Sequence, residues 1–263
     1  MSLIAATLVS LVIFVLLPMV VQMGGGKLGF APHQVAQAGF FLQWAIVFVL
    51  FRPIWRVIPQ VWRKIFSWAS SLELVLWVGI TILYQLAFLG ELAEFLEKQH
   101  PYLSWGWSSL LEGHEGGNLL IGFIRALAPP DARSFGDLAV PLVLLSLFAV
   151  AILPLMAWAE ELFFRRGCYR LWKILPLSIG FGLVHVASGV SLAEATALSI
   201  PGFGLGIMYY VLSRPQRRQG FRQGWKDDPA LVACATYHFL YNLVAVSFLC
   251  YKIFILPIVA TNV

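Results

Sequence analysis

Two adjacent carboxylates, Glu160 and Glu161, stand inside an apolar stretch of this sequence and are followed by Leu-Phe-Phe-Arg-Arg-Gly. Burying a carboxylate among apolar groups is unfavourable unless another group compensates for its charge. Residues four apart share one face of a helix, so Glu161 lies over Arg165 in the order that favours an ion pair. Glu160 points in another direction, where Phe164 keeps the face apolar. The spacing therefore predicts a Glu161–Arg165 pair and leaves Glu160 available as a general base.

Two histidines stand in the apolar stretches that follow. His185 comes nine residues after Pro176, and His238 comes nine residues after Pro229. If both stretches enter a membrane from the same side, each imidazole lies on the order of 13 Å deep, at about 1.5 Å per residue. Glu160 fits the same level. The sequence thus predicts a carboxylate and two imidazoles at one depth.

Each histidine has a partner one turn away on its own helix face. Phe181 precedes His185 by four residues and can pack on its ring, and Asn242 follows His238 by four residues. A carboxylate with an imidazole can activate water, and a histidine with an asparagine can stabilise an oxyanion. These side chains form a complete set for amide hydrolysis without a metal.

The elements that must position these residues are membrane helices. Hydrophobic residues make up 60% of the 263 residues and charged residues only 12%, against about 25% in soluble domains. The net charge of +5 is concentrated in a few short loops, which indicates membrane orientation and not nucleic-acid binding. Cys168, Cys234 and Cys250 lack metal-ligand or disulfide spacing and are interpreted as small buried hydrophobic residues. The chain is expected to be an integral, multi-pass membrane protein.

An all-α, polytopic transmembrane bundle of about seven spans is predicted, with a cytoplasmic N-terminus. Basic and acidic loops alternate as this orientation requires. The expected spans cover, approximately, residues 2–22, 38–51, 67–90, 138–173, 177–186, 191–212 and 229 to the end. Motif content divides the chain into an N-terminal region (1–137) with an outer acidic segment, a catalytic core (138–255) and a tail (256–263).

Several expectations concern helix boundaries. Residues 52–64 are expected to form a basic cytoplasmic loop. The fourth span is expected to run unbroken past Glu160 to Lys173, with Pro154 as a kink, and Pro176 is expected to open the fifth.

Two further patterns concern the helix after the fifth span. Ser191-x-x-Glu194 predicts a capping box, which gives Glu194 a structural role. Gly202-x-x-x-Gly206 predicts close packing against another helix.

Three motifs in this order resemble those of the CAAX protease and bacteriocin-processing (CPBP) family, which includes the type II CAAX prenyl endopeptidases. They are Glu160-Glu161-x-x-x-Arg165, Phe181-x-x-x-His185 and His238-x-x-x-Asn242. The resemblance covers roughly residues 138–255, and three ordered motifs are far more specific than any one of them.

The resemblance implies an intramembrane glutamic endopeptidase that needs no metal and no cofactor. Glu160 would deprotonate the attacking water with help from His185, and His238 and Asn242 would hold the oxyanion. Glu161 and Arg165 would brace the helix. The site would open to the cytoplasmic side and to membrane lipid, and the partner would be a peptide or protein substrate, with or without a lipid. No nucleic-acid partner is implied.

Other interpretations remain open at this point. Glu160, His185 and His238 could instead be zinc ligands of a metalloprotease. The chain could be a membrane scaffold or a bacteriocin-immunity-type protein that does not cut its partner. A transporter could use the same groups as a proton relay, although the sequence has no inverted repeat. The two glutamates could also be interfacial acids at the end of a span.

Overall fold

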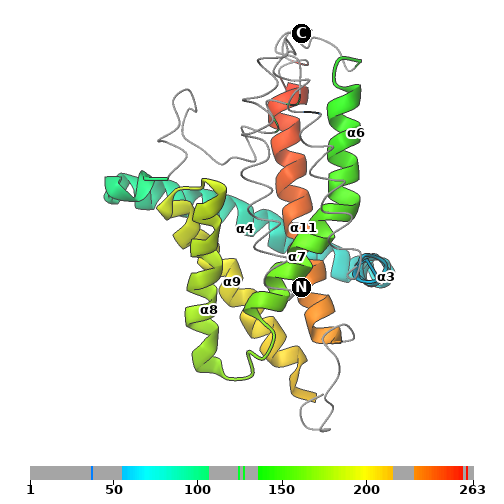
Figure 1. Cartoon of the computed structure of the whole chain (residues 1–263), viewed down its shortest axis with the longest axis vertical. Helices are drawn as coiled ribbons and strands as arrows, with labels where there is room; N and C mark the ends of the chain where they lie inside the picture. Colours follow the sequence, from blue (N-terminus) through cyan, green and yellow to red (C-terminus); the bar gives the residue numbers. More distant parts are fainter. Residues whose placement is uncertain are drawn as a thin grey trace. The chain divides into compact units, whose positions relative to one another are not determined.

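The structure is a computed structural model that describes residues 37, 55–106, 124, 127, 136–215, 228–256 and 259 of the chain. The regular structure of these residues is all helical, as predicted. The predicted spans at residues 2–22 and 38–51 lie outside the described residues. In chain order the α-helices are α3 (Val57–Ala69), α4 (Leu72–Gln99), α6 (Ala139–Leu147), α7 (Leu153–Phe164), α8 (Leu171–Val184), α9 (Leu192–Leu212) and α11 (Pro229–Cys250) (Figure 1).

Four stretches of helix in the described residues are long and apolar enough to cross a membrane. They are α4 with 28 residues, Ala139–Phe164 with 26, α9 with 21 and Pro229–Ile255 with 27. Helix α8 is also apolar but shorter. These lengths match the roughly 20 residues that a helix needs to cross a bilayer, and they agree with a helical membrane protein.

The chain divides into two compact units. Unit 1 comprises residues 1–55, 120–155 and 243–263, and unit 2 comprises residues 56–119 and 156–242. In unit 1, the amide of Gln37 donates a hydrogen bond of 2.8 Å to the carbonyl of Leu127. All the candidate site residues belong to unit 2. The boundaries predicted after residues 137 and 255 stay a prediction.

The helix that carries Glu160 has one irregular turn. A π-helical turn at Phe148–Ile152 stands directly before Pro154. Proline cannot donate a backbone hydrogen bond, and its ring crowds the carbonyl four residues earlier. A locally wider turn accommodates both effects. The helix is thus irregular just ahead of Pro154, and the kink predicted at Pro154 itself stays a prediction.

The same helix ends at Phe164, so the predicted continuation to Lys173 is wrong. Gly167 adopts a φ of 77°, a left-handed conformation that glycine enters without strain. The chain reverses there and α8 begins at Leu171. Pro176 therefore lies inside α8. The expectation that Pro176 opens this helix is wrong.

Helix α8 ends just before a site residue. A 3₁₀ turn, His185–Ser188, follows Val184, and it ends at Gly189 with a φ of 87°. His185 therefore stands at the exit of α8 and not within it.

The capping box predicted at the start of α9 is confirmed. The Ser191 hydroxyl accepts a hydrogen bond from the Glu194 amide, and the Glu194 carboxylate accepts one from the Ser191 amide.

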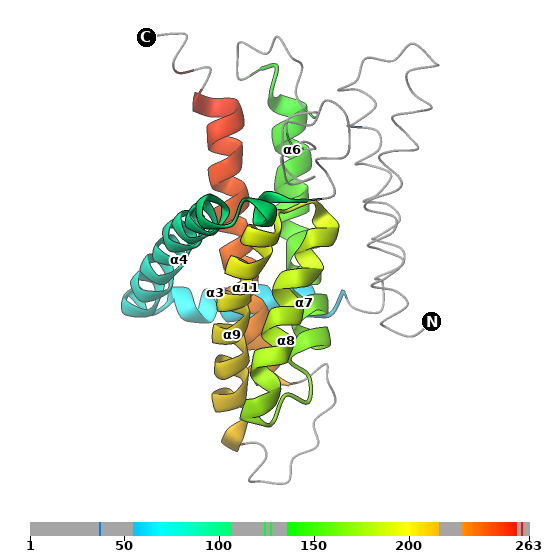
Figure 2. The same cartoon turned by 90° about the vertical axis from the view of Figure 1, so that its left-hand side faces the viewer.

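Helices α8 and α9 run side by side (Figure 2). The predicted glycine packing is confirmed, because a Cβ at Gly202 would lie 2.8 Å from the Phe181 ring and one at Gly206 would lie 2.6 Å from Ile174. On α8, a Cβ at Gly182 would collide with the carbonyl oxygen of Ala195.

Helix α4 crosses the first turns of α9. Leu89 and Ala93 of α4 form a buried cluster with Ala193 and Ala197 of α9. The Ser191 hydroxyl also donates to the Glu97 carboxylate at 2.7 Å. Helix α4 ends at Gln99, so it continues well past its predicted end at residue 90.

Helix α3 lies across the first half of α11 (Figures 1 and 2). Its Trp62 packs edge-on against Phe239 of α11, with ring centroids 5.4 Å apart. Residues 57–64 were predicted as loop and are helical, because Val57 and Val61 present a buried apolar face one turn apart.

We expect Gly182→Ala to destabilise the protein, because the added methyl group meets backbone that cannot move without separating α8 from α9. Overpacking of this kind costs about 1–3 kcal/mol. Thermal unfolding in detergent measures the effect. Gly204→Ala is the matched control, since a Cβ there meets nothing within 4 Å, and its melting temperature should stay unchanged or rise. Equal melting temperatures for the two variants would contradict the packing described here.

Candidate active site

The predicted ion pair between Glu161 and Arg165 is present and completely buried. Nε of Arg165 lies 3.2 Å from Oε2 of Glu161, and both side chains have no exposed surface. Arg165 follows the last residue of α7, yet its amide still donates to the Glu161 carbonyl at 2.8 Å. The i,i+4 spacing is thereby kept across the end of the helix.

Aromatic rings surround the Arg165 guanidinium. Its Cζ lies 5.1 Å from the ring centre of Phe181 and 5.9 Å from that of Phe164. These distances fall within the range of cation–π contacts. The terminal nitrogens of Arg165 are buried and have no hydrogen-bond partner among the described residues. The charge of Arg165 is therefore compensated chiefly by Glu161 and the two rings.

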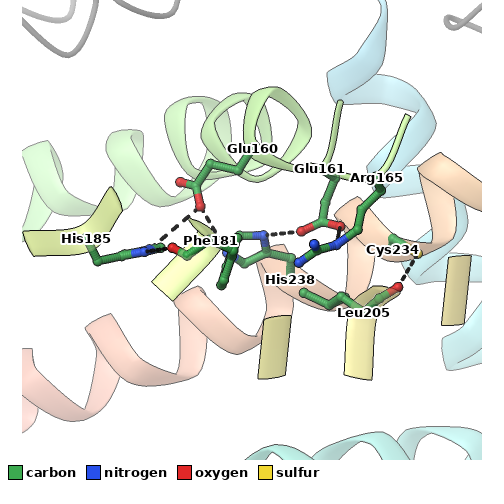
Figure 3. A network of polar contacts seen from close by, with 8 residues as sticks. All are labelled: Glu160, Glu161, Arg165, Phe181, His185, Leu205, Cys234 and His238. Atoms are coloured by element: carbon green, nitrogen blue, oxygen red, sulfur yellow. Dashed lines mark hydrogen bonds and ion pairs between the residues drawn. The ribbon is translucent and has the colours of Figure 1, made fainter. Parts of the chain in front are cut away.

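Glu161 also holds His238, which sequence reasoning missed. Nδ1–H of His238 donates to Oε1 of Glu161 at 3.0 Å, in the interior of unit 2. One carboxylate oxygen thus faces the arginine and the other faces the histidine (Figure 3). Because a carboxylate oxygen accepts the bond, the proton is on Nδ1, and Nε2 of His238 points away from Glu161.

His185 is oriented in the same way by a different acceptor. Its Nδ1–H donates to the carbonyl of Phe181 at 2.7 Å. That carbonyl lies in the last turn of α8, where carbonyls lack partners within the α-helix. The 3₁₀ turn at His185 supplies this donor. Both imidazoles are therefore held through Nδ1, and Nε2 of each is directed at the same place.

That place is the carboxylate of Glu160. Its Oε2 atom lies 3.7 Å from Nε2 of His185 and 3.7 Å from Nε2 of His238. Figure 3 shows the carboxylate pointing toward both rings. The distance is too long for a direct hydrogen bond. The Glu160 side chain is 22% exposed, unlike Glu161 beside it.

A small cavity adjoins the two histidines. Its volume is about 30 Å³, large enough for water and too small for a peptide. The lining includes His185, His238 and Asn242. The structure thus brings the histidines and Asn242 to one cavity and places Glu160 beside both histidines.

Phe181 is the common neighbour of these groups. Its ring packs edge-on against His185 with centroids 5.0 Å apart, as predicted, and against His238 at 5.4 Å. It also contacts Phe164 at 5.5 Å. A single ring therefore contacts the Arg165 guanidinium and both imidazoles.

Two tyrosines that line the cavity were missed from the sequence. Tyr237 and Tyr241 are four residues apart on α11 and lie next to His238 and Asn242 in sequence. Tyr237 and Tyr241 are four residues apart, as His238 and Asn242 are, and this shared spacing was the signal that could have identified them. The hydroxyl of Tyr237 donates to Gln85 of α4 at 3.1 Å, which ties this wall of the cavity to α4.

Metal binding was the alternative use of Glu160, His185 and His238. Among the described residues, no group of three or more histidine, cysteine or acidic side chains has the arrangement of a metal site. The structure gives this alternative no positive support, and the reaction itself must be tested in the presence of a chelator.

We expect Arg165→Met to lower the free energy of unfolding by about 3–5 kcal/mol, because it leaves the Glu161 carboxylate buried without its cation. Denaturant unfolding in mild detergent measures this change. Adding Glu161→Gln to the same chain should recover part of the loss, since no unpaired charge then remains. Lys98→Met is the matched control: Lys98 forms an i,i+4 pair with Glu94 at 2.6 Å, but on the surface. The control should not change stability, and a similar effect of both substitutions would contradict the role assigned to burial.

Comparison of the chain with protein-family models, with curated proteins and with solved structures finds no match. The resemblance to the CPBP family therefore stays a prediction from the three motifs.

Proposed function

We propose that the protein is an intramembrane glutamic endopeptidase of the CPBP type, which hydrolyses a peptide bond near the cytoplasmic face of a membrane. The proposal rests on the two histidine side chains that converge on the Glu160 carboxylate. Oε2 of Glu160 lies 3.7 Å from Nε2 of both His185 and His238, while Nδ1 of each histidine is bonded elsewhere. The proposed reaction places the attacking water between these three atoms.

In the first step Glu160 accepts a proton from this water as the oxygen attacks the carbonyl carbon of the substrate. Nε2 of His185 accepts the second hydrogen bond of the water and orients it. A new C–O bond forms, and the carbonyl oxygen becomes an oxyanion. His238, protonated also on Nε2 and held by Glu161, donates to the oxyanion together with the amide of Asn242.

In the second step the tetrahedral intermediate collapses. The C–N bond breaks, and the leaving amine takes the proton that Glu160 accepted. The products are a carboxyl group and an amine, and Glu160 returns to the carboxylate. Glu161 and Arg165 act as positioning residues, since they hold His238 and do not reach the substrate.

The topology that fits this reaction has about seven spans, a cytoplasmic N-terminus and a site open to the cytoplasmic side. Arg166 and Arg170 in the turn between α7 and α8, together with Lys173 in the first turn of α8, support this orientation through the positive-inside rule. The substrate is a peptide or protein, with or without a lipid. It must open the cavity, since about 30 Å³ does not admit a peptide bond with its neighbours.

We expect Glu160→Gln to abolish cleavage, with a loss of at least about 100-fold, because the glutamine cannot accept a proton. Purified wild type and variant are incubated with a library of lipidated and unlipidated peptides, and new termini are read by mass spectrometry. Glu91→Gln on α4 is the control, since Glu91 is exposed and lies on another helix. It should cleave as wild type does.

Other outcomes of this experiment separate the alternatives. Loss of cleavage in EDTA would favour the zinc interpretation, and full activity there would remove it. If wild type and Glu160→Gln are both folded and neither cleaves any peptide, the endopeptidase proposal fails in favour of a scaffold or immunity-type role.

We expect Asn242→Ala to lower kcat by about 10²–10³-fold with little change in KM, because its amide contributes mainly in the transition state. Ser247→Ala, at an exposed position on the same helix, should leave both constants unchanged. An increase in KM at constant kcat would show that Asn242 binds substrate and does not stabilise an oxyanion.

A further inference from the structure

Helix α3 has a polar face that the proposed reaction does not use. The helix has 13 residues, and its buried positions are Val57 and Val61. A second stripe, with i, i+3, i+4 and i+7 spacing, is polar or cationic; it consists of Gln60, Arg63, Lys64 and Ser67. No acidic residue occurs in α3. The two faces make α3 an amphipathic cationic helix.

The polar stripe of α3 borders a groove against the first turn of α11. The groove has a volume of about 390 Å³ and is wide open, and all six residues that line it belong to unit 2. They are the four residues of the stripe together with Pro229 and Val232. The groove is separate from the water-sized cavity at His185 and His238, because the two share no lining residue.

The positive charge in this groove is not neutralised by a carboxylate among the described residues. Nε of Arg63 donates to the carbonyl of Pro59 at 3.3 Å, and the Lys64 ammonium lies 5.9 Å from the centre of the Trp68 ring. Asp228 precedes α11, but its oxygens accept from the amides of Ala230 and Leu231 and from the hydroxyl of Tyr209. Two cations thus face an open groove.

The orientation of α3 matches that of a helix lying in a membrane interface. It lies across α11, as both overall views show. Trp62 contacts Phe239, ten residues into α11, whereas the polar stripe faces Pro229 and Val232 at its start. The apolar face is therefore directed toward the middle of α11, and the cationic face is directed toward its first turn. Interfacial amphipathic helices place their faces in this way.

We propose that the groove between α3 and α11 binds the headgroup of an anionic phospholipid. Arg63 and Lys64 contact its phosphate. Ser67 is exposed in the same groove and its hydroxyl donates to the carbonyl of Lys64 at 2.8 Å, so its oxygen is available to accept from a hydroxyl of the headgroup. This combination favours a glycerol headgroup over choline, which carries a fixed positive charge and no donor. The proposal does not depend on the proteolytic function.

The experiment measures lipid binding to the full chain in detergent by native mass spectrometry. The probes are dioctanoyl phosphatidylglycerol and dioctanoyl phosphatidylcholine. We expect Arg63→Gln/Lys64→Gln to weaken phosphatidylglycerol binding by about tenfold or more, since each cation near a membrane surface contributes substantially. Arg170→Gln/Lys173→Gln is the matched control: it removes the same charge, and Lys173 has a similar contact with Trp172 at 5.6 Å. The control should change binding by less than about twofold.

A second variant tests whether binding needs the open groove as well as its positive charge. Ser67→Phe fills the groove without changing the net charge, and it should weaken phosphatidylglycerol binding while leaving the melting temperature of the lipid-free protein unchanged. Equal losses in the two double variants would overturn the proposal in favour of general electrostatic attraction. Equal affinity for phosphatidylcholine, or for water-soluble glycerol 3-phosphate, would overturn it as well, since the first needs no anionic headgroup and the second needs no lipid.

Discussion

The buried ion pair between Glu161 and Arg165 is the interaction on which the candidate site depends. Neither charge is exposed, so each requires a partner inside the protein. Arg165 takes one oxygen of Glu161, and His238 takes the other. That second bond fixes the position of a proton on His238 and aims its Nε2 atom at Glu160. The charge of the arginine thus determines the orientation of an imidazole one helix away.

Phe181 transmits the same constraint to the other histidine. Its ring contacts the Arg165 guanidinium and both imidazoles, and its carbonyl accepts from His185. The ring in turn is pressed against α9, because the place opposite it is Gly202. A larger residue at that position would displace the ring and, with it, His185. The glycine packing of α8 and α9 therefore serves the geometry of the site as well as the stability of the helix pair.

The sequence allowed accurate prediction wherever one helix contained the whole interaction. The Glu161–Arg165 pair, the capping box at Ser191 and the edge-on packing of Phe181 against His185 all follow from fixed spacings along a helix and the turn that continues it. The bond between Glu161 and His238 joins residues far apart in sequence, so no spacing encodes it. The end of α7 was placed too late because Gly167 was overlooked as a reversal point among the surrounding basic residues.

Access to the proposed active site is governed by which wall of the cavity is able to move. The α8–α9 wall is held by close glycine contacts, where a small separation would lose packing along both helices. The opposite wall belongs to α11, where Tyr237 and Tyr241 lie beside His238 and Asn242. Tyr241 packs against the buried cluster of α4 and α9 residues described above, and Tyr237 is tied to Gln85 of α4. Both tyrosines thus join this wall to α4, so a substrate of the proposed endopeptidase that enters through this wall has to displace these contacts.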